Sequence, residues 1–317
     1  NVPLVAEVAK RDAVTDEDIV EQVVARYGAQ NIRAFWLVGH SQGGFTSHRI
    51  LNAHGLAVPH WPLEWGGRDW SPVQRYLFVE ELQRAAVPLP LQFNCYMVGP
   101  VIARFGNEAQ KKYYLPRLAV GEEIPCFGLT EPDYGSDVAG VTVQATPETV
   151  DGVPGYVING VKTWCTFGAR ADVLMLLART DPDRSIGHRG LSMFIVPKLR
   201  GEGHGFVVHQ NDMEGPGAGK MEGRPIDTIG YRGMHSFELF FEEFIVHADA
   251  LIGEAQGEGR GFYLTMTGMV GGRLQTAARA NGVMHAAFNE AMRYATGRRV
   301  FGRPIADYPL TSVQFAR

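Results

Sequence analysis

The sequence predicts a multi-domain α+β protein. It divides into an N-terminal helical domain (1–125), a central β-barrel-like or β-sandwich domain (126–250) and an incomplete C-terminal helical bundle (251–317). Apolar residues recur at helical spacing in the first part, alternate or form short runs in the middle, and return to helical spacing from Gly257. Glycine makes up 38 of 317 residues without any low-complexity repeat, so many glycines are expected at turns and close backbone approaches.

Helix-start signals mark the first 125 residues. Thr15 with Asp18 resembles a capping box, and Ser71 followed by Pro72 is typical of a helix N-terminus. Behind Ser71, apolar residues at helical spacing predict a helix up to Ala86. Two more helices are expected at 93–105 and, capped by Asn107, at 108–115.

The middle region shows the pattern of strands. Phe237, Leu239 and Phe241 lie on one side of an alternating segment, opposite Glu238, Phe240 and Glu242. Short apolar runs at 172–178 and 191–196, bounded by glycine, proline and charges, predict buried strands. The segment 211–225 is rich in glycine and charge, which favours a surface loop.

A long helix is expected after Gly257. Its apolar stripe advances by three or four residues, and we interpret this stripe as core packing in a bundle rather than as a cofactor contact. The stripe comprises Met266, Met269, Arg273, Ala277, Ala280, Met284, Phe288 and Met292.

Composition excludes several classes of function. The net charge of −4 and the lack of a clustered basic face argue against nucleic-acid binding. No apolar run reaches the roughly 18 residues of a membrane span. Three cysteines without CxxC spacing, and histidines without ligand spacing, give neither a disulfide framework nor a metal site. No signal-peptide pattern opens the chain, so the expected compartment is the cytoplasm.

Two segments of the middle region could carry chemistry. At 126–137 a strand leads into a Gly-Ser turn, which can aim backbone amides and the Thr130 hydroxyl at a ring or a phosphate. At 160–168 a second strand presents Trp164 and Thr166 on the same face, where an indole can cover a planar cofactor. Taken singly, a capped turn at Ser136 and a half-buried strand explain these patterns equally well.

Together the motifs resemble the acyl-CoA dehydrogenase family. Phe127–Ser136, Lys162–Thr166 and Arg298–Gly302 are similar, in order and spacing, to its flavin-binding motifs. The segment 106–122 resembles the helix that leads into the family's β domain, and glycines 253, 259 and 261 resemble its entry into the third domain. The resemblance covers about Gly55 to Arg317 and implies the family's helical, β, helical architecture.

The resemblance implies roles residue by residue. Ser136 matches a serine near the flavin pyrophosphate and the CoA thioester arm, Trp164 a tryptophan that covers the flavin ring, and Thr166 a threonine near flavin N5. Arg298 and Phe301 match positions that reach the FAD of a neighbouring subunit. The complete set of implied cofactor-binding residues is Phe127, Leu129, Thr130, Gly135, Ser136, Trp164, Cys165, Thr166, Arg298 and Phe301.

The implied reaction is FAD-dependent α,β-dehydrogenation of an acyl-CoA thioester to the trans-2-enoyl-CoA. It proceeds by α-proton abstraction and β-hydride transfer to flavin N5. Ser136 and Arg273 are the implied substrate-binding residues. The resemblance also implies electron-transfer flavoprotein as redox partner and a tetramer, either a homotetramer (dimer of dimers) or a heterotetramer.

The sequence departs from the family pattern at three places. Val270 stands where an aspartate is frequent, and Pro309 stands where a glutamine helps to bind the neighbour's FAD. A minority of the family places the catalytic base on the position of Gly272, which has no side chain to act. The chain starts without Met and its helical pattern reaches Arg317, so we expect a fragment whose catalytic base lies beyond that residue.

Two alternative functions remain open. The first is a catalytically silent acyl-CoA dehydrogenase-like subunit of a mixed oligomer, which Val270 and the unassigned base allow. The second is a serine hydrolase, because Gly39-His-Ser41-Gln-Gly43 matches the nucleophile elbow G-x-S-x-G. Only 38 residues precede Gly39, and no doubly wound α/β pattern follows it, which argues against the hydrolase.

Overall fold

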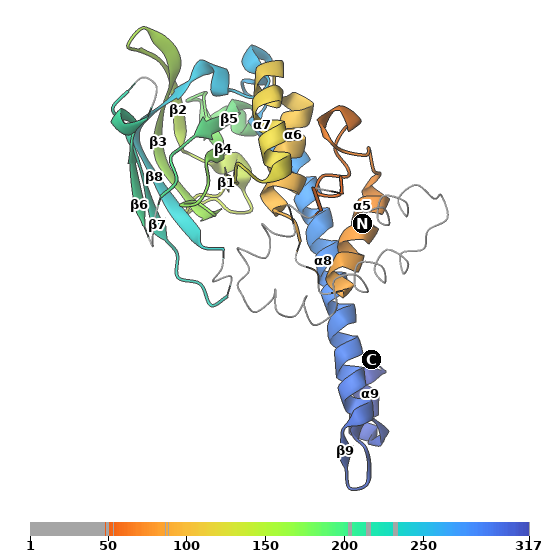
Figure 1. Cartoon of the computed structure of the whole chain (residues 1–317). Coiled ribbons are helices and arrows are strands. Elements are labelled where there is room, and N and C mark those ends of the chain that lie inside the picture. Colours follow the sequence, from red (N-terminus) through yellow and green to blue (C-terminus); the bar gives the residue numbers. More distant parts are fainter. Residues whose placement is uncertain are drawn as a thin grey trace. The chain divides into compact units, whose positions relative to one another are not determined.

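The computed structural model describes residues 48, 51–52, 54–85, 87, 89–201, 205–213, 217–230 and 234–316 (Figure 1). The helix predicted behind Thr15 and the Ser41 elbow lie outside these residues. The described chain forms two compact units: one takes in Trp70–Leu89 and the residues from Arg273 onward, and the other the residues before Trp70 together with Pro90–Gly272. The predicted α+β class, with helical, β and helical parts in that order, is confirmed.

The first unit is built on α5 (Pro72–Arg84) and on the part of α8 (Gly261–Gly297) that follows Arg273. The predicted start of α5 is confirmed, because the Ser71 hydroxyl accepts from the Gln74 amide and the Gln74 side chain accepts from the Ser71 amide. The helices approach closely at Gly282, where an added Cβ would lie 2.2 Å from the carbonyl oxygen of Glu80. The remaining elements are β9 (Arg299–Val300), β10 (Arg303–Pro304) and α9 (Pro309–Phe315).

The helices of the second unit follow the predicted ranges with two differences. The predicted helix 93–105 is a π-helix over Phe93–Val98 followed by α6 (Gly99–Phe105). The helix capped by Asn107 is α7 (Glu108–Val120), which continues through Pro116 to a left-handed glycine at Gly121 instead of ending at residue 115. The first part of α8 belongs to this unit as well.

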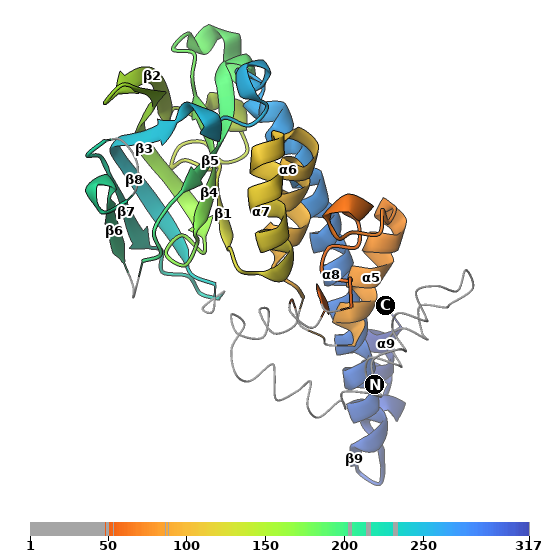
Figure 2. The same cartoon turned by 45° about the horizontal axis from the view of Figure 1, so that its top comes forward.

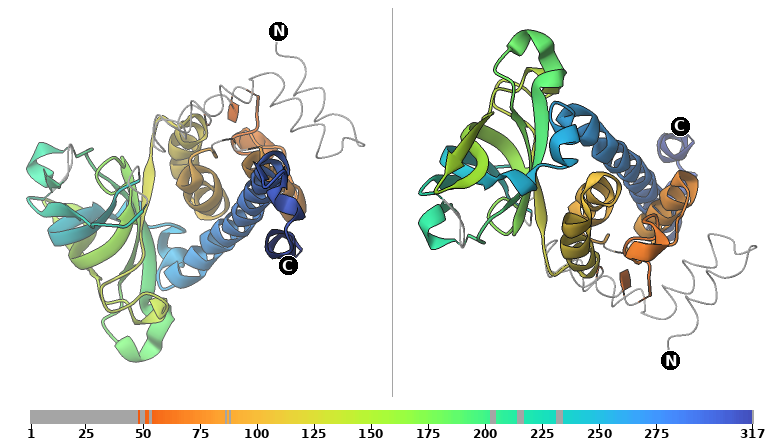
Figure 3. Two further views of the ribbon diagram at one scale, coloured as in Figure 1. Left: turned by 90° about the horizontal axis from the view of Figure 1, so that it is seen from below. Right: turned by 90° about the horizontal axis from the view of Figure 1, so that it is seen from above.

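The β region of the second unit is one curled sheet of eight strands within the described residues. Its order is β1-β4-β2-β3-β8-β7-β6, with β5 antiparallel to β4. The sheet forms a half-barrel, and α6 and α7 lie outside one wall of it (Figure 2, Figure 3). The strands are β1 (Pro125–Gly128), β2 (Gln144–Val150), β3 (Val153–Thr166), β4 (Val173–Arg179), β5 (Leu191–Pro197), β6 (Phe206–His209), β7 (Lys220–Pro225) and β8 (Ser236–His247).

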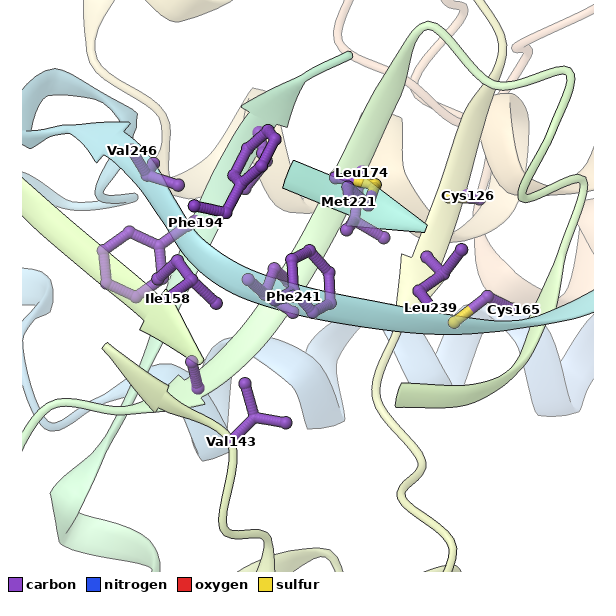
Figure 4. Close-up of a cluster of buried hydrophobic side chains, with 14 of the residues drawn as sticks. Cys126, Val143, Ile158, Cys165, Leu174, Phe194, Met221, Leu239, Phe241 and Val246 are labelled. Carbon is purple, nitrogen blue, oxygen red and sulfur yellow. The ribbon is translucent and has the colours of Figure 1, made fainter. Parts of the chain in front are cut away.

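The concave side of this sheet holds the main apolar core (Figure 4). The predicted buried strands are confirmed as β4 and β5, whose side chains are almost all buried. In β8 the predicted alternation is confirmed too, with Phe237, Leu239 and Phe241 in the core. Cys95, Cys126 and Cys165 are buried free thiols.

The surface-loop prediction for 211–225 is wrong at its end, because residues 220–225 form β7. Met221 is buried in the core, while Lys220 pairs with Glu242 of the next strand. Gly223 is required by packing, since an added Cβ would lie 2.0 Å from the Phe206 ring. The charges and the glycine of this segment suggested a loop. The strand β7 nevertheless alternates, but only two of its residues, Met221 and Gly223, face inward.

The interpretation of the α8 methionine stripe as core is wrong from Arg273 to Phe288, where its members are exposed, whereas Met266, Met269 and Met292 are partly buried. Met284 is 60% exposed and Phe288 47% exposed. The buried positions of α8 are instead dominated by small or polar residues, among them Gly268, Gln275 and Ala278. Small residues permit close approach of neighbouring backbones, which a stripe of large side chains would prevent. No helix among the described residues is long and apolar enough to cross a membrane.

Candidate functional site

A cavity of about 520 Å³ lies within the second unit, where the segment after β1 meets the end of β3 and the neighbouring strands β7 and β8. Three predicted residues, Thr130, Gly135 and Trp164, line it together although they come from two separate motifs. Its other lining residues are Glu131, Pro132, Thr163, Pro225, Ile226 and Glu238.

A β-bulge places Trp164 at this cavity. Lys162 pairs with Leu239 but Cys165 pairs with Phe237, so β3 holds one extra residue at this point. Trp164 takes a left-handed conformation (φ +59°), and Cys165 occupies the inward position that a regular strand would give to the tryptophan. The indole is consequently 55% exposed on the opposite face, where it borders the cavity.

The segment after β1 is attached to this bulge through its backbone. The Thr163 amide donates to the Thr130 carbonyl at 2.8 Å, so the two sides of the cavity are hydrogen-bonded to each other. A short turn follows, in which Glu131 and Tyr134 exchange two backbone hydrogen bonds of 3.1 Å. Gly135 and Ser136 come directly after this turn and are exposed.

A buried ion pair forms part of the cavity wall, because Glu131 lines the cavity and pairs with Lys162 behind it. Lys162 is fully buried on the core face of β3, and its Nζ donates to Glu131 Oε1 at 2.8 Å and to the Leu129 carbonyl at 3.0 Å. Burial alone would raise the pKa of Glu131, but Lys162 and the hydrogen bonds to the carboxylate outweigh it and lower that pKa. Burial lowers the pKa of Lys162, against the opposing effect of Glu131. We assign an ionised pair at neutral pH. The groups around the Glu131 carboxylate are all hydrogen-bond donors, and only the ionised carboxylate can accept from all of them.

The remaining predicted residues of the β region do not line the cavity. Phe127 is buried on β1 and Leu129 is partly buried. Cys165 is buried in the core, with its thiol directed at the Thr163 carbonyl. Thr166 shares a hydrogen bond of 3.1 Å with the Ser236 hydroxyl.

Three predicted residues belong to the first unit. Arg273 is exposed on α8, and Arg298 follows its C-terminus. Phe301 forms the tip of the β9–β10 hairpin together with Gly302; both have positive φ, and the Phe301 side chain is 93% exposed. Arg273, Arg298 and Phe301 are not among the residues that line the cavity of the second unit.

Sequence reasoning missed the charged residues of the site, above all Glu131. A weak signal was present: Glu131 closely follows the apolar run 126–129 and Lys162 lies in a strand that also carries Val161 and Trp164, which is typical of a buried pair. Glu238 was read only as the outward side of an alternating strand, yet it lines the cavity. Among the described residues, no group of three or more His, Cys, Asp or Glu side chains could hold a metal ion.

Comparison with known proteins agrees with this arrangement. Three family models match in sequence order: the N-terminal domain of acyl-CoA dehydrogenase at residues 16–122, its middle domain at 126–244 and its C-terminal domain at 259–317. The similarity thus begins well before Gly55, where the sequence motifs placed it. The first match also includes Ser41, which leaves no separate hydrolase domain around that residue.

Individual relatives support the same assignment. The chain is 35% identical to (2S)-methylsuccinyl-CoA dehydrogenase of Cereibacter sphaeroides over 84% of this chain and 45% of that protein, so it spans about half of that relative's length. It is 32% identical to a short-chain-specific acyl-CoA dehydrogenase of Clostridium acetobutylicum, over 92% of this chain and 72% of that protein. The solved butyryl-CoA dehydrogenase of Megasphaera elsdenii superposes with a TM-score of 0.68 at 27% identity, covering 98% of this chain and 73% of the other. On these grounds the chain belongs to the acyl-CoA dehydrogenase family.

Proposed function

We propose that this chain carries the flavin site of an FAD-dependent acyl-CoA dehydrogenase, which converts an acyl-CoA to the trans-2-enoyl-CoA. The observation that carries the proposal is the single cavity bordered by Thr130, Gly135 and Trp164. Two motifs some 30 residues apart in the sequence build it, and both resemble flavin-binding motifs of the family.

The residues at the cavity fit a flavin. Trp164 presents an exposed indole, which suits contact with a planar ring. No hydrogen bond to the Thr130 hydroxyl is found within the described parts of the chain, so this donor is available to a ring with several acceptors. Gly135 leaves open space where a side chain would stand, which allows close approach to its backbone amide.

In this assignment the bound flavin supplies the hydride acceptor. The chain's own residues bind and orient: Thr130 donates a hydrogen bond, and Trp164 covers the ring and keeps water from one side of it. Ser136 would contact the thioester arm of CoA, and Arg273 would bind substrate. We assign no catalytic base to any described residue, because Gly272, the position used by a minority of the family, has no side chain.

Assembly and electron transfer belong to the same proposal. Phe301, almost fully exposed at a hairpin tip, suits a residue that reaches the FAD of a second subunit together with Arg298. We propose a homotetramer or heterotetramer, electron-transfer flavoprotein as acceptor and a cytoplasmic location. We also propose that the chain is divided into three domains, at residues 1–125, 126–250 and 251–317.

The test is the visible absorption spectrum of the purified protein, recorded before and after anaerobic addition of a panel of acyl-CoA thioesters. Oxidised-flavin bands that bleach with one thioester class would establish the activity and identify the acyl group. A folded sample without flavin, and without the ability to take up added FAD, would refute the proposal. An ester substrate with Ser41→Ala as control would then test the hydrolase alternative.

A catalytically silent subunit is the second candidate, favoured by the lack of a side chain at Gly272 and by Val270 beside the substrate arginine. It predicts a flavin spectrum that no thioester bleaches. After co-expression with an active family member, a mixed oligomer that contains this chain should then be isolated, and the thioester should bleach only the fraction of its flavin that the active subunits hold.

A further inference from the structure

The Glu131–Lys162 pair does more than neutralise two buried charges, because the Glu131 carboxylate binds the chain on both sides of a loop. Glu131 Oε2 accepts from the Thr142 amide at 2.6 Å and from the Thr142 hydroxyl at 2.8 Å. Its Oε1 accepts from the Val143 amide at 2.9 Å. Residues 131 and 142–143 are therefore held together, and the loop between them is closed at its base.

The loop so closed contains residues of the proposed cofactor and substrate sites. Gly135 lines the cavity, and Ser136 follows it. Both are exposed and lie in a segment without regular strand or helix, so their positions depend on how the base of the loop is fixed. A carboxylate with four donors fixes that base more firmly than one neutral hydrogen bond would.

Lys162 extends the same connection to the other side of the cavity. Its ammonium donates to the carbonyl of Leu129, the residue before Thr130, while also binding Glu131. It lies two positions before Trp164, at the start of the β3 bulge. One ion pair thus holds the Thr130 segment, the closed loop and the bulge in a single hydrogen-bonded unit.

Stability alone does not explain a buried ion pair here. Desolvating two charges costs several kcal/mol, and well-packed apolar residues often replace such pairs without loss of stability. The role of the pair is therefore sought in the segments that it holds in place. We propose that Glu131 and Lys162 are positioning residues that hold the loop 131–142 closed beside the cavity and thereby set the affinity of the cavity for the flavin. The affinity part rests on the function proposed above, whereas the loop closure does not.

The experiment compares Glu131→Gln, Lys162→Met and the double variant Glu131→Gln/Lys162→Met with the wild type. The double variant removes both charges, so it should fold even if Lys162→Met, which strands a buried carboxylate, does not. Hydrogen exchange of the Thr142 and Val143 amides is measured on the FAD-free protein, and the dissociation constant for added FAD on the same samples. The matched control is Glu222→Gln, which breaks an exposed ion pair with Arg224 on β7 of the same unit.

We expect exchange at Thr142 and Val143 to be about tenfold faster in Glu131→Gln and in the double variant, as for a lost charge-assisted hydrogen bond. FAD should bind about tenfold more weakly to both, while Glu222→Gln should behave as wild type. A folded double variant with wild-type exchange and wild-type FAD affinity would overturn the proposal. Faster exchange with unchanged FAD affinity would overturn its affinity part. If the wild type binds no FAD at all, the proposed function fails, and the exchange rates still decide whether the pair closes the loop.

Discussion

Two polar centres of the second unit compensate for the loss of water around them in opposite ways: the Glu131–Lys162 pair, here called the β centre, and His48, here called the helical centre. Glu131 and Lys162 are both charged, and the carboxylate is surrounded by donors beside the cavity. His48 is fully buried among helices and does not line the cavity, and burial keeps it neutral by lowering its pKa to about 4. Its Nε2 donates to the Ala119 carbonyl at 2.8 Å, and its Nδ1 accepts from the Leu91 amide at 3.3 Å.

The difference shows what each centre depends on. A neutral imidazole has one donor and one acceptor, so two backbone groups satisfy it without any charged partner. It joins three parts of the chain that are distant in sequence, and the Cys95 thiol lies 3.6 Å from the same Nδ1. The ion pair, in contrast, is satisfied only while both members are present. The β centre should therefore be sensitive to removal of a partner, and the helical centre to pH.

The largest expected effect is that of Lys162→Met on stability. Removing the ammonium leaves the Glu131 carboxylate buried without its counter-charge, which typically costs about 3–5 kcal/mol of unfolding free energy. Urea denaturation followed by circular dichroism measures it. Glu131→Gln/Lys162→Met should recover most of this loss, because no unpaired charge remains. A loss below about 1 kcal/mol in the single variant would mean that water or another group reaches the carboxylate.

Acidification should weaken the helical centre. Burial lowers the pKa of His48 from 6.5 to about 4, against the opposing effect of the hydrogen bond to Ala119. Because the unfolded chain binds the proton more readily, this contribution to stability is complete above pH 6.5 and is lost as the pH falls towards 4. The full loss is roughly 3 kcal/mol, at about 1.4 kcal/mol per pKa unit. Urea denaturation at pH 7 and pH 5 should show a little over half of it, roughly 2 kcal/mol.

The control for this prediction is His48→Gln. A glutamine offers an NH2 group that can donate and a carbonyl oxygen that can accept but does not titrate, so this variant should lose the pH dependence between 7 and 5 even if it is less stable at pH 7. Equal pH dependence in wild type and His48→Gln would assign the effect to other groups.

A smaller effect is expected at the start of α7, the helix that carries Ala119. The Asn107 side chain accepts from the Gln110 amide at 2.8 Å, and the Gln110 side chain accepts from the Asn107 amide at 3.0 Å. Asn107→Ala should cost about 1 kcal/mol, as for other lost N-caps. Thermal denaturation measures this, with Asn107→Ser as the conservative control that should retain most of the stability.

The sequence predicted those features that depend on local pattern. The capping residues Ser71 and Asn107, the buried strands β4 and β5 and the alternation of β8 are set by neighbours within one turn or a few residues, and all are confirmed. The prediction that the α8 stripe is core was wrong at Met284 because hydrophobic residues were assumed to be buried. Where α8 approaches its neighbour closely, glycine occupies the contact and Met284 is exposed. The strand β7 was not predicted because its inward positions, Met221 and Gly223, are defined by pairing with β6 and β8, whose partner residues lie 13 to 20 positions away in the sequence.

The cavity also combines features that a local pattern predicts with features that depend on distant strand pairing. Thr130, Gly135 and Trp164 were named from motifs, but their meeting at one cavity depends on the register of β3 against β8. Sequence spacing alone would also have placed Trp164 and Lys162 on one face of a regular strand. The bulge separates them, sending the lysine to Glu131 and the indole to the exposed side. Such a shift depends on pairing between strands some 75 residues apart, which no local pattern contains.

The smallest effect on stability, with a large one on ligand binding, is expected at this bulge. Trp164→Gly removes the contacts of a half-exposed indole, worth about 1–2 kcal/mol, and relieves a left-handed conformation that costs a non-glycine residue about 1–2 kcal/mol. The two should nearly cancel, so unfolding by urea should change by less than about 1 kcal/mol, while FAD binds about tenfold more weakly if the indole covers the ring. Asp151→Gly is the matched control, because Asp151 is exposed, has the same left-handed backbone (φ +54°) and lies outside the cavity lining. Weaker FAD binding in both variants would point to a general gain in backbone freedom rather than to the indole, and wild-type binding in Trp164→Gly would remove the indole from the flavin site.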